Sequence, residues 1–192
     1  MNMRVSLILS LLSVLALTGC SNYTPKPHGY PKIDFPERSY TLYDDGCAYT
    51  FKKPTYAVVV PDTHERSEPC WYNIHFPNFG ATVYLSYKSL EHPDQLDSLA
   101  DDAFKLAGKN QIRADAIEEI EIETQSGNKG IVFELFGPSA TPFNFYISDE
   151  KKHYLRGSFY FDNHTKTDSV APVYEFLKED FNVLINSVEW RH

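Results

Sequence analysis

Two kinds of hydrophobic repeat follow one another along the chain, and their order limits the folds open to it. Segments with a period of two predict strands, because successive side chains of a strand point to opposite faces of a sheet. The 13 Tyr, 13 Phe and 2 Trp favour the same β-rich core. Strands are expected at residues 39–43, 48–51, 56–60, 71–76, 81–87, 117–123, 131–136, 143–148 and 153–161, with a short closing strand at 188–190.

Two other segments space their apolar residues three and four apart, which predicts helices. The first covers residues 94–108, and Gly108 is its predicted C-cap. The second begins near Ser169 or Pro172, because proline is tolerated in the first turn of a helix. It ends at residues 186–187, just before the closing strand.

This order of elements predicts an α+β domain. Consecutive hairpins imply a mainly antiparallel sheet, with two or so helices packed on it. No internal repeat or change of composition interrupts residues 37–192, so we expect them to form a single globular domain. The order also resembles the PsbP/Mog1-like arrangement of an antiparallel sheet flanked by helices. Such a likeness bears on the fold and not on the function.

The first 19 residues have the features of an export signal. A short basic segment precedes an apolar run from Val5 to Leu17. A membrane-spanning helix takes about 20 apolar residues, so this run fits the core of a signal peptide instead. The following Leu-Thr-Gly-Cys sequence resembles the lipobox of bacterial lipoproteins, which predicts cleavage before Cys20 and acylation of its thiol by chains such as palmitate. The alternative is a secreted protein in which Cys20 is incidental.

Residues 20–36 predict a tether between the lipid anchor and the domain. Proline disfavours both helix and central strand. A segment rich in proline is therefore expected to act as a semi-extended spacer that holds the domain off the bilayer. The prolines are Pro25, Pro27, Pro31 and Pro36.

Cys47 and Cys70 are the two cysteines that remain after Cys20. In an exported protein such a pair favours one disulfide. It would contribute about 3 kcal/mol in the chain-entropy model. A reactive thiol pair or half of a metal site is the alternative, although the CxxC spacing is absent.

The charge balance and the motifs exclude several classes of protein. The chain carries 26 acidic and 18 basic residues, a net charge of −8. General nucleic-acid binding is therefore not expected, because it needs clustered lysine and arginine. The sequence contains no GxSxG, HExxH, Walker or GxGxxG motif. We predict a protein that is not an enzyme and needs no cofactor or metal.

One conceivable metal site would use His64, Cys70 and His75, which lie close together in the sequence. His75 falls in a predicted strand, however, and Cys70 is better placed in the predicted disulfide. The sequence therefore disfavours a metal site here.

Two further groups of residues could carry chemistry. Asp149, His153 and Arg156 surround a predicted hairpin turn, but His153 and Arg156 are three residues apart on a strand and point to opposite faces. We therefore interpret this group as a charged hairpin. Ser139 and Thr141 lie in a Gly/Pro loop, and no base is identifiable nearby in the sequence. A hydrolase site is therefore not supported here.

Strand tyrosines offer a different kind of site, because such rings are buried while their hydroxyls stay accessible. On an exposed sheet face they would suit contact with a protein or a glycan. Packing in the core and at its rim is the other reading, and we favour it for most of them. The residues are Tyr72, Tyr84, Tyr87, Tyr146, Tyr154 and Tyr160.

Most of the chain after residue 19 resembles the GldD family of gliding-motility-associated lipoproteins. The resemblance includes the lipobox and both later cysteines. It rests on residues 70–77 (CWYNIHFP) with 85–88 (LSYK), 140–149 (ATPFNFYISD) with 153–161 (HYLRGSFYF), 168–173 (DSVAPV) with the following helix to Trp190, and 26–31 (KPHGYP) with 33–36 (IDFP).

The resemblance implies a cell-envelope lipoprotein needed for gliding and for the associated type 9 secretion machinery. It implies other gliding or secretion lipoproteins and envelope proteins as partners, and no enzymatic activity. Only Cys20 transfers as a functional position. Residues 21–26, directly after Cys20, contain no acid, which favours the periplasmic side, and Ser21 is compatible with transfer to the outer membrane.

Two other functions remain open at the level of the sequence. One is a membrane-anchored binding module for a small ligand, lipid or glycan, with the strand tyrosines lining a groove. The other is an envelope enzyme, which would need His64, His75 or His153 to meet carboxylates in space.

Overall fold

Strands dominate the part of the chain that a computed structural model describes, which is residues 33–110, 114–137, 139, 141–162 and 167–191. They form two sheets, and every strand pair in them is antiparallel. The smaller sheet has the order β1-β2-β10, with β1 at Tyr40–Tyr43, β2 at Tyr49–Pro54 and β10 at Glu189–Trp190.

The larger sheet has seven strands in the order β3-β4-β5-β9-β8-β7-β6. Four strands from β6 to β9 form a meander, and β3, β4 and β5 form another. The two meanders meet where β5 pairs with β9, with Tyr84 opposite Ser158. The strands span Val58–Pro61 (β3), Tyr72–Phe76 (β4), Ala81–Ser89 (β5), Ala116–Glu123 (β6), Lys129–Phe136 (β7), Phe143–Ser148 (β8) and His153–Phe161 (β9).

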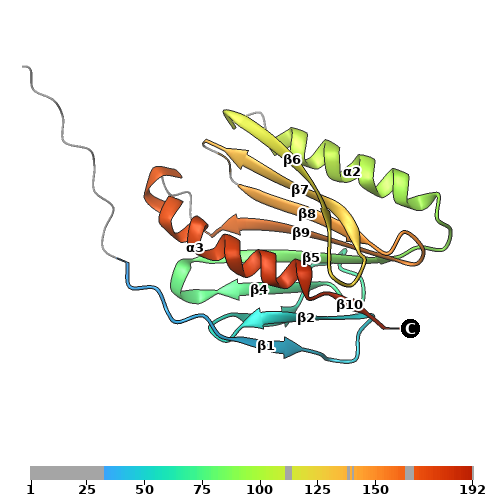
Figure 1. Cartoon of the computed structure of the whole chain (residues 1–192), viewed down its shortest axis with the longest axis horizontal. Helices are drawn as coiled ribbons and strands as arrows, with labels where there is room; N and C mark the ends of the chain where they lie inside the picture. The colour runs from blue at the N-terminus through green and yellow to red at the C-terminus, as the bar shows by residue number, and fades with distance from the viewer. Residues whose placement is uncertain (1–32, 111–113, 138, 140, 163–166, 192) are drawn as a thin grey trace, which may run out of the picture. The chain divides into compact units, whose positions relative to one another are not determined.

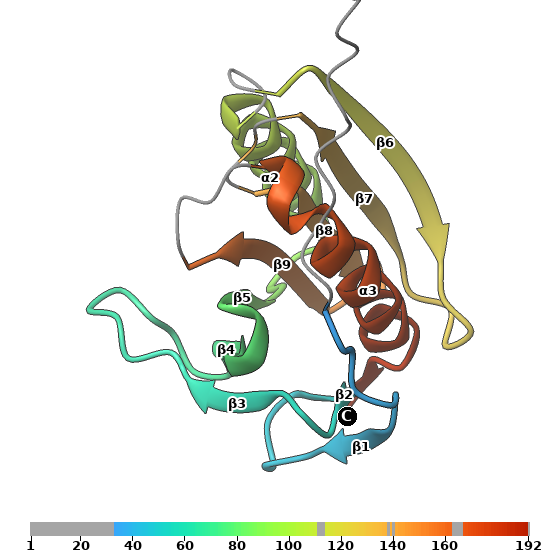
Figure 2. The ribbon, with the colours of Figure 1, turned by 90° about the vertical axis from the view of Figure 1, so that its left-hand side faces the viewer.

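The helices α2 (Gln95–Asn110) and α3 (Thr167–Asn186) pack on opposite faces of the seven-stranded sheet (Figures 1 and 2). Ala103 and Ala107 of α2 cluster with Phe133 of β7, whereas α3 belongs to the cluster that contains the adjacent Val132. Neighbouring residues of a strand point to opposite faces. The two helices therefore cover the two faces, and the α+β class predicted from the element order is confirmed.

The main core lies between the sheet and α3. Phe181 of α3 is its centre: the ring lies 4.8 Å from Phe159, 5.1 Å from Phe143 and 6.1 Å from Phe76 between centroids. These distances are typical of favourable aromatic pairs. The aromatic strand residues thus build the core that the composition predicts.

The three-stranded sheet closes the lower side of this core in Figure 1. The side chains of Tyr49 and Phe51 in β2 are buried there, and β2 contacts α3. β10 pairs with β2 in a register that places Glu189 opposite Thr50 and Trp190 opposite Tyr49. The last residues of the chain therefore complete a sheet that begins near residue 40.

Some predicted boundaries differ from the structure. Gly108 is not a C-cap, because α2 continues to Asn110 and Gly108 lies inside the helix. α3 begins at Thr167, so Pro172 lies within the helix and not at its start. β2 runs on to Pro54, past the predicted end at residue 51.

The reason for the first two differences is tertiary packing. Ala107 is buried against the sheet beside Gly108, and this contact extends the helix past a weak helix former. Val173, directly after Pro172, is likewise buried in the main core. Helix propensity contributes less to the stability of a helix in a folded protein than such burial does.

Candidate functional site

The six strand tyrosines divide according to what covers them. Tyr72, Tyr87 and Tyr154 are buried, and Tyr146 is half-buried. Tyr84 and Tyr160 are instead 42% and 37% exposed. Core packing is therefore the right interpretation for four of the six, and only the last pair offers a surface.

The hydroxyls of two buried tyrosines hold neighbouring elements in place. Tyr87 and His153 are joined by a hydrogen bond of 2.8 Å between the hydroxyl and Nδ1. Tyr154 donates to the carbonyl of Leu99 in α2 at 3.2 Å. Burial raises the pKa of both tyrosines, so both hydroxyls stay protonated.

Tyr84 lies on the same face of the sheet as α2, but beyond the helix. The register places Tyr84, Ser158, Asn144 and Phe133 in one row across β5, β9, β8 and β7. Phe133 is covered by α2, through an edge-to-face contact of 5.0 Å with Phe104. The helix thus covers the β7 side of this face and Tyr154 of β9, and it leaves the half around Tyr84 and Ser158 uncovered.

We call this uncovered half the Arg156 face and define it by Tyr84, Ser86, Arg156, Ser158 and Tyr160. These residues line a shallow hollow of about 430 Å³, together with Phe161 and Asp162. The rings of Tyr84 and Tyr160 meet edge to face at 5.5 Å. Arg156 is half-buried at one end of the hollow and makes no hydrogen bond or ion pair with any described residue.

A chain of polar contacts lies at the other end of this hollow. His75 Nδ1 and Thr82 Oγ1 are 3.0 Å apart, and Thr82 donates to Asp162 Oδ1 at 2.9 Å. Asp162 itself is exposed. The hollow therefore has a cation at one end and a carboxylate at the other.

A second hollow, of about 500 Å³, lies between the start of α2 and strands β6 to β8. Its rim carries Asp97, Glu121, Glu123 and Glu150. Lys129 forms an ion pair of 2.9 Å with Glu150, and this hydrogen bond raises the pKa of the lysine. Because these charges are exposed to water, we interpret this hollow as a solvated acidic surface.

The three residues of the conceivable metal site, His64, Cys70 and His75, do not come together. Cys70 is bonded to Cys47, His75 contacts Thr82, and His64 accepts a hydrogen bond from the backbone of Arg66 at 3.3 Å. Within the described ranges, no group of three His, Cys, Asp or Glu side chains is placed to hold a metal ion.

The Asp149 group is a structured turn. Asp149 Oδ1 accepts three backbone N–H groups, those of Lys151 at 3.0 Å and of Lys152 and His153 at 2.8 Å each. Arg156 lines the uncovered sheet face, whereas His153 lies on the opposite face against Trp190. The predicted charged hairpin describes this region, and His153 and Arg156 do not form one site.

The loop before β8 shows a local turn contact. Ser139 Oγ accepts the backbone N–H of Thr141 at 3.2 Å, and Thr141 is fully buried. This contact orders the loop. It does not bring a catalytic base to the hydroxyl of Ser139 or Thr141.

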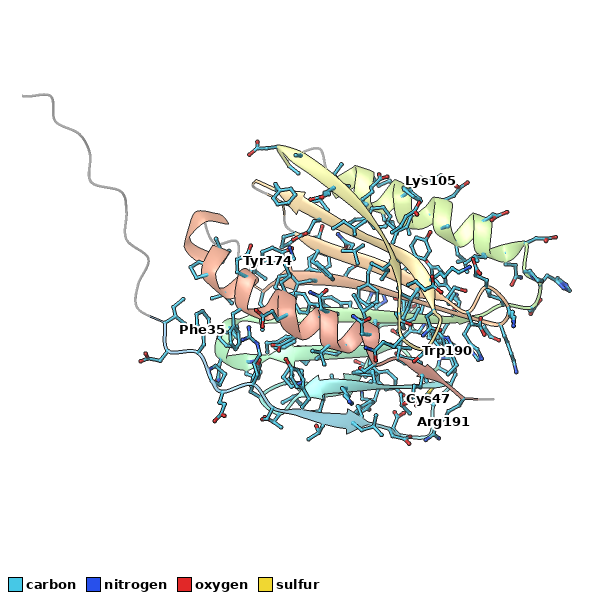
Figure 3. The ribbon with its side chains drawn as sticks, viewed as in Figure 1. Phe35, Cys47, Lys105, Tyr174, Trp190 and Arg191 are labelled. Carbon is cyan, nitrogen blue, oxygen red and sulfur yellow. A yellow bond between two sulfur atoms is a disulfide. The ribbon has the colours of Figure 1, made fainter. Side chains whose placement is uncertain are left out.

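The disulfide Cys47–Cys70 connects the loop after β1 with the loop before β4. Its Cα atoms are 5.8 Å apart, a normal separation for this bond. Tyr49 donates its hydroxyl to the carbonyl of Cys70 at 3.1 Å. Figure 3 shows Cys47 close to Trp190 and Arg191, and Arg191 donates its backbone N–H to Ala48 at 2.8 Å. The bond therefore ties the two sheets together beside the C-terminal strand.

Sequence reasoning missed two buried carboxylates on the α3 side. Asp180, only 1% exposed, accepts hydrogen bonds from Tyr40 at 2.8 Å and Tyr56 at 2.5 Å, and Arg38 lies 3.8 Å away. Burial raises the pKa of Asp180, although the two tyrosine hydrogen bonds and the charge of Arg38 oppose the shift. Burial and the bond to Asp180 also raise the pKa of Tyr40 to about 12.

The second buried carboxylate is Glu134 of β7. It accepts a hydrogen bond from Tyr174 at 2.7 Å and forms an ion pair with Lys178 at 2.5 Å. Both partners belong to α3. Burial first, and the Glu134 contact second, raise the pKa of Tyr174. No spacing in the sequence signals either carboxylate, because their partners lie far away along the chain.

The lipidation site predicted at Cys20 lies outside the described residues. In the part of the chain that is described, none of the helices is long and apolar enough to cross a membrane. Residues 33–36, the last of the predicted tether, pack on the domain, with Phe35 stacked on Phe176 at 4.4 Å.

Comparison with known proteins agrees with this architecture. The chain is similar in fold to the solution structure of cyanobacterial PsbP (CyanoP) from Synechocystis sp. PCC 6803, with a TM-score of 0.51 and 11% identity. The match covers 86% of this chain and 100% of that one. At this identity the likeness shows the fold alone, and it confirms the PsbP-like arrangement expected from the element order.

Among curated proteins, none matches this sequence. The model of one protein family does match it, from residue 20 to residue 190, and that family is described as gliding motility lipoprotein GldD. The match begins at the predicted lipidation site and ends in β10, so it includes every described element. The chain therefore belongs to the GldD family of gliding motility lipoproteins.

Proposed function

We propose that this protein is a non-enzymatic accessory or assembly component of the gliding motility and type 9 secretion machinery, held in the cell envelope by a lipid. The observation that carries the proposal is the family match over residues 20–190. In this proposal the domain acts by presenting a protein-binding surface close to the membrane.

The anchor in this proposal is an acyl group on Cys20 in the outer membrane, facing the periplasm. In this proposal residues 20–36 form the tether, and two of its last residues, Ile33 and Phe35, pack on the domain. The absence of acids in residues 21–26 supports the periplasmic side, and Ser21 is compatible with transfer to the outer membrane.

Binding to a protein fits the surface better than binding to an enclosed small ligand. The hollow of the Arg156 face is shallow and lined by tyrosine, serine and arginine. Tyrosine and arginine are enriched among the residues that dominate protein interfaces. A small ligand, lipid or glycan is instead expected in a cavity that buries most of its surface.

Deletion of the gene tests the proposal, with complementation by the wild type or by Cys20→Ala. Colony spreading and secreted protein are scored together, and labelling with radioactive palmitate reports acylation. We expect both activities to be lost on deletion, restored by the wild type and not restored by Cys20→Ala. Ser21→Ala is the matched control, because it alters the neighbouring residue and keeps the thiol. Normal spreading and secretion in the deletion strain would contradict the proposed function.

A further inference from the structure

We propose that the Arg156 face is a docking surface for a protein segment that brings one carboxylate to Arg156 and apolar side chains to Tyr84 and Tyr160. This inference deepens the proposed function, since it names the surface and the chemistry of the partner. It rests on the position of Arg156, the aromatic pair beside it and the length of the hollow.

The charge of Arg156 points to a carboxylate. Its guanidinium has no acidic partner among the described residues, although the chain carries 26 acids and only 18 bases. The guanidinium also offers a fork of donors that matches a carboxylate with two parallel hydrogen bonds. Arg38 and Arg191, by contrast, are paired with acids of this chain.

The surroundings of Arg156 fit a protein contact. The register places Ser86 and Tyr146 directly beside it, so no neighbouring strand brings it a negative charge. Tyr84 and Tyr160 add two large exposed rings in contact with each other. Their edge-to-face contact leaves apolar ring surface exposed to a partner.

The length of the hollow points to a segment of polypeptide. Arg156 and Asp162 stand at its two ends, about 20 Å apart along β9 at roughly 3.3 Å per residue. A single sugar or small acid cannot reach both ends, whereas about six extended residues can. We therefore expect a donor or a basic side chain on the partner to meet Asp162.

The net charge of the chain limits the partner further. A charge of −8 repels a strongly acidic protein at long range. The carboxylate that meets Arg156 must then be a single local group in a segment that is otherwise neutral or basic. Reversal of the charge at Arg156 should affect this partner more than reversal at any cation outside the face.

Site-specific photo-crosslinking of the full-length lipoprotein in its own cells tests the inference. p-Benzoylphenylalanine replaces Tyr84 or Tyr160, and Leu42 on β1 serves as an exposed control position at 61% exposure. Each probe is combined with Arg156→Glu, Arg156→Lys or Arg66→Glu. Arg66 is a matched control because it is exposed and lies outside the hollow.

We expect the probes at 84 and 160 to yield the same protein product, and the probe at 42 not to. Arg156→Glu should lower the yield of this product about tenfold, equivalent to about 1.4 kcal/mol. Arg156→Lys keeps the charge but loses the two parallel hydrogen bonds, so it should lower the yield less than Arg156→Glu does. Arg66→Glu should leave the yield unchanged. Mass spectrometry should find Asp or Glu in the linked segment. Reversal of that residue to Lys should restore the product with Arg156→Glu.

Several results would overturn the inference: a yield that ignores the charge at 156, a linked segment without a carboxylate, a glycan or lipid product, or no product at a normal level of anchored protein. The same strains separate this inference from the proposed function. If deletion abolishes gliding and secretion while Arg156→Glu preserves both, the docking surface is wrong and the function stands. If deletion changes neither gliding nor secretion while the charge-dependent product forms, the docking surface stands and the proposed function is wrong.

Discussion

Trp190 lies flat against His153, with ring centroids 5.1 Å apart and ring planes 8° from parallel. Trp190 belongs to β10 of the three-stranded sheet, and His153 begins β9 of the seven-stranded sheet. The indole N–H also donates to the side-chain oxygen of Asn128. The C-terminal strand thus joins the two sheets through a single aromatic residue.

Trp190→Ala should therefore lower the free energy of unfolding by about 3 kcal/mol, since it removes a large ring from this junction. Trp190→Phe should cost less, about 1 to 2 kcal/mol, because an aromatic ring remains while the hydrogen bond to Asn128 and part of the ring system are lost. Urea unfolding of the mature chain measures both. Leu42→Ala, at an exposed position, should change stability by less than about 0.5 kcal/mol. Equal losses for Ala and Phe would show that the ring itself does not join the sheets.

Removal of the disulfide should destabilise the protein by about 3 kcal/mol. The bond spans a sequence separation of 23, and closing a loop of that length lowers the entropy of the unfolded chain by this amount. The double variant Cys47→Ser/Cys70→Ser and the reduced wild type should lose similar stability in urea. A loss only in the reduced wild type would indicate that the free thiols, and not the missing constraint, cause the effect.

The turn at Asp149 should make stability depend on pH. Burial raises the pKa of this carboxyl, but the N–H groups of His153, Lys152 and Lys151 outweigh burial and lower it below its usual value. A lowered folded pKa stabilises the protein above the unfolded pKa of about 4, and this contribution is lost as pH falls through the folded pKa.

Asp149→Asn keeps the oxygen acceptor and cannot ionise, which makes it the reference for this effect. The stability difference between wild type and Asp149→Asn should be largest near pH 7 and shrink below about pH 4. Asp149→Ala should cost about 1 to 2 kcal/mol at pH 7, like the loss of a helix cap. Urea unfolding at several pH values measures these differences, and a constant difference across them would refute the assignment.

Tyr56 and Asp180 should be strongly coupled. Tyr56→Phe leaves the buried carboxylate with one tyrosine donor fewer, which should cost about 1.5 to 3 kcal/mol. The same substitution in an Asp180→Asn background should cost less, because the acceptor is no longer charged. A double-mutant cycle measures the coupling energy. Tyr43→Phe is the matched control, since its hydroxyl bonds the exposed Asp45, and additive effects at 56 and 180 would contradict the coupling.

Gly157 and Gly108 should respond to alanine in opposite directions. A Cβ at Gly157 would lie 2.1 Å from the ring of Phe145 in the core, so Gly157→Ala should destabilise by about 1 to 3 kcal/mol. A Cβ at Gly108 meets nothing within 4 Å, and alanine favours the helix, so Gly108→Ala should stabilise by about 0.5 to 1 kcal/mol. Thermal unfolding distinguishes them, and a stable Gly157→Ala would mean that the Phe145 ring moves freely.

Local patterns predicted most of the secondary structure. Val83, Leu85 and Tyr87 are buried together in β5, as their alternation predicts, because side-chain direction in a strand depends only on neighbouring residues. The α+β class followed from the order of these elements, and the family followed from motifs spread over the chain. Helix ends were less predictable, because the burial of Ala107 carries α2 past Gly108.

The candidate site could not be predicted in the same way. Tyr84 and Tyr154 are both strand tyrosines on the face that α2 packs against, yet Tyr154 is buried beneath the helix and Tyr84 is exposed beside it. The pairing of β5 with β9, which places Arg156 next to Ser86, joins segments far apart in the sequence. The sequence by itself thus determined which side chains share a face, since that is a local property of the backbone. Tertiary structure alone decided which of them are covered, because burial depends on the distant elements that pack above each face.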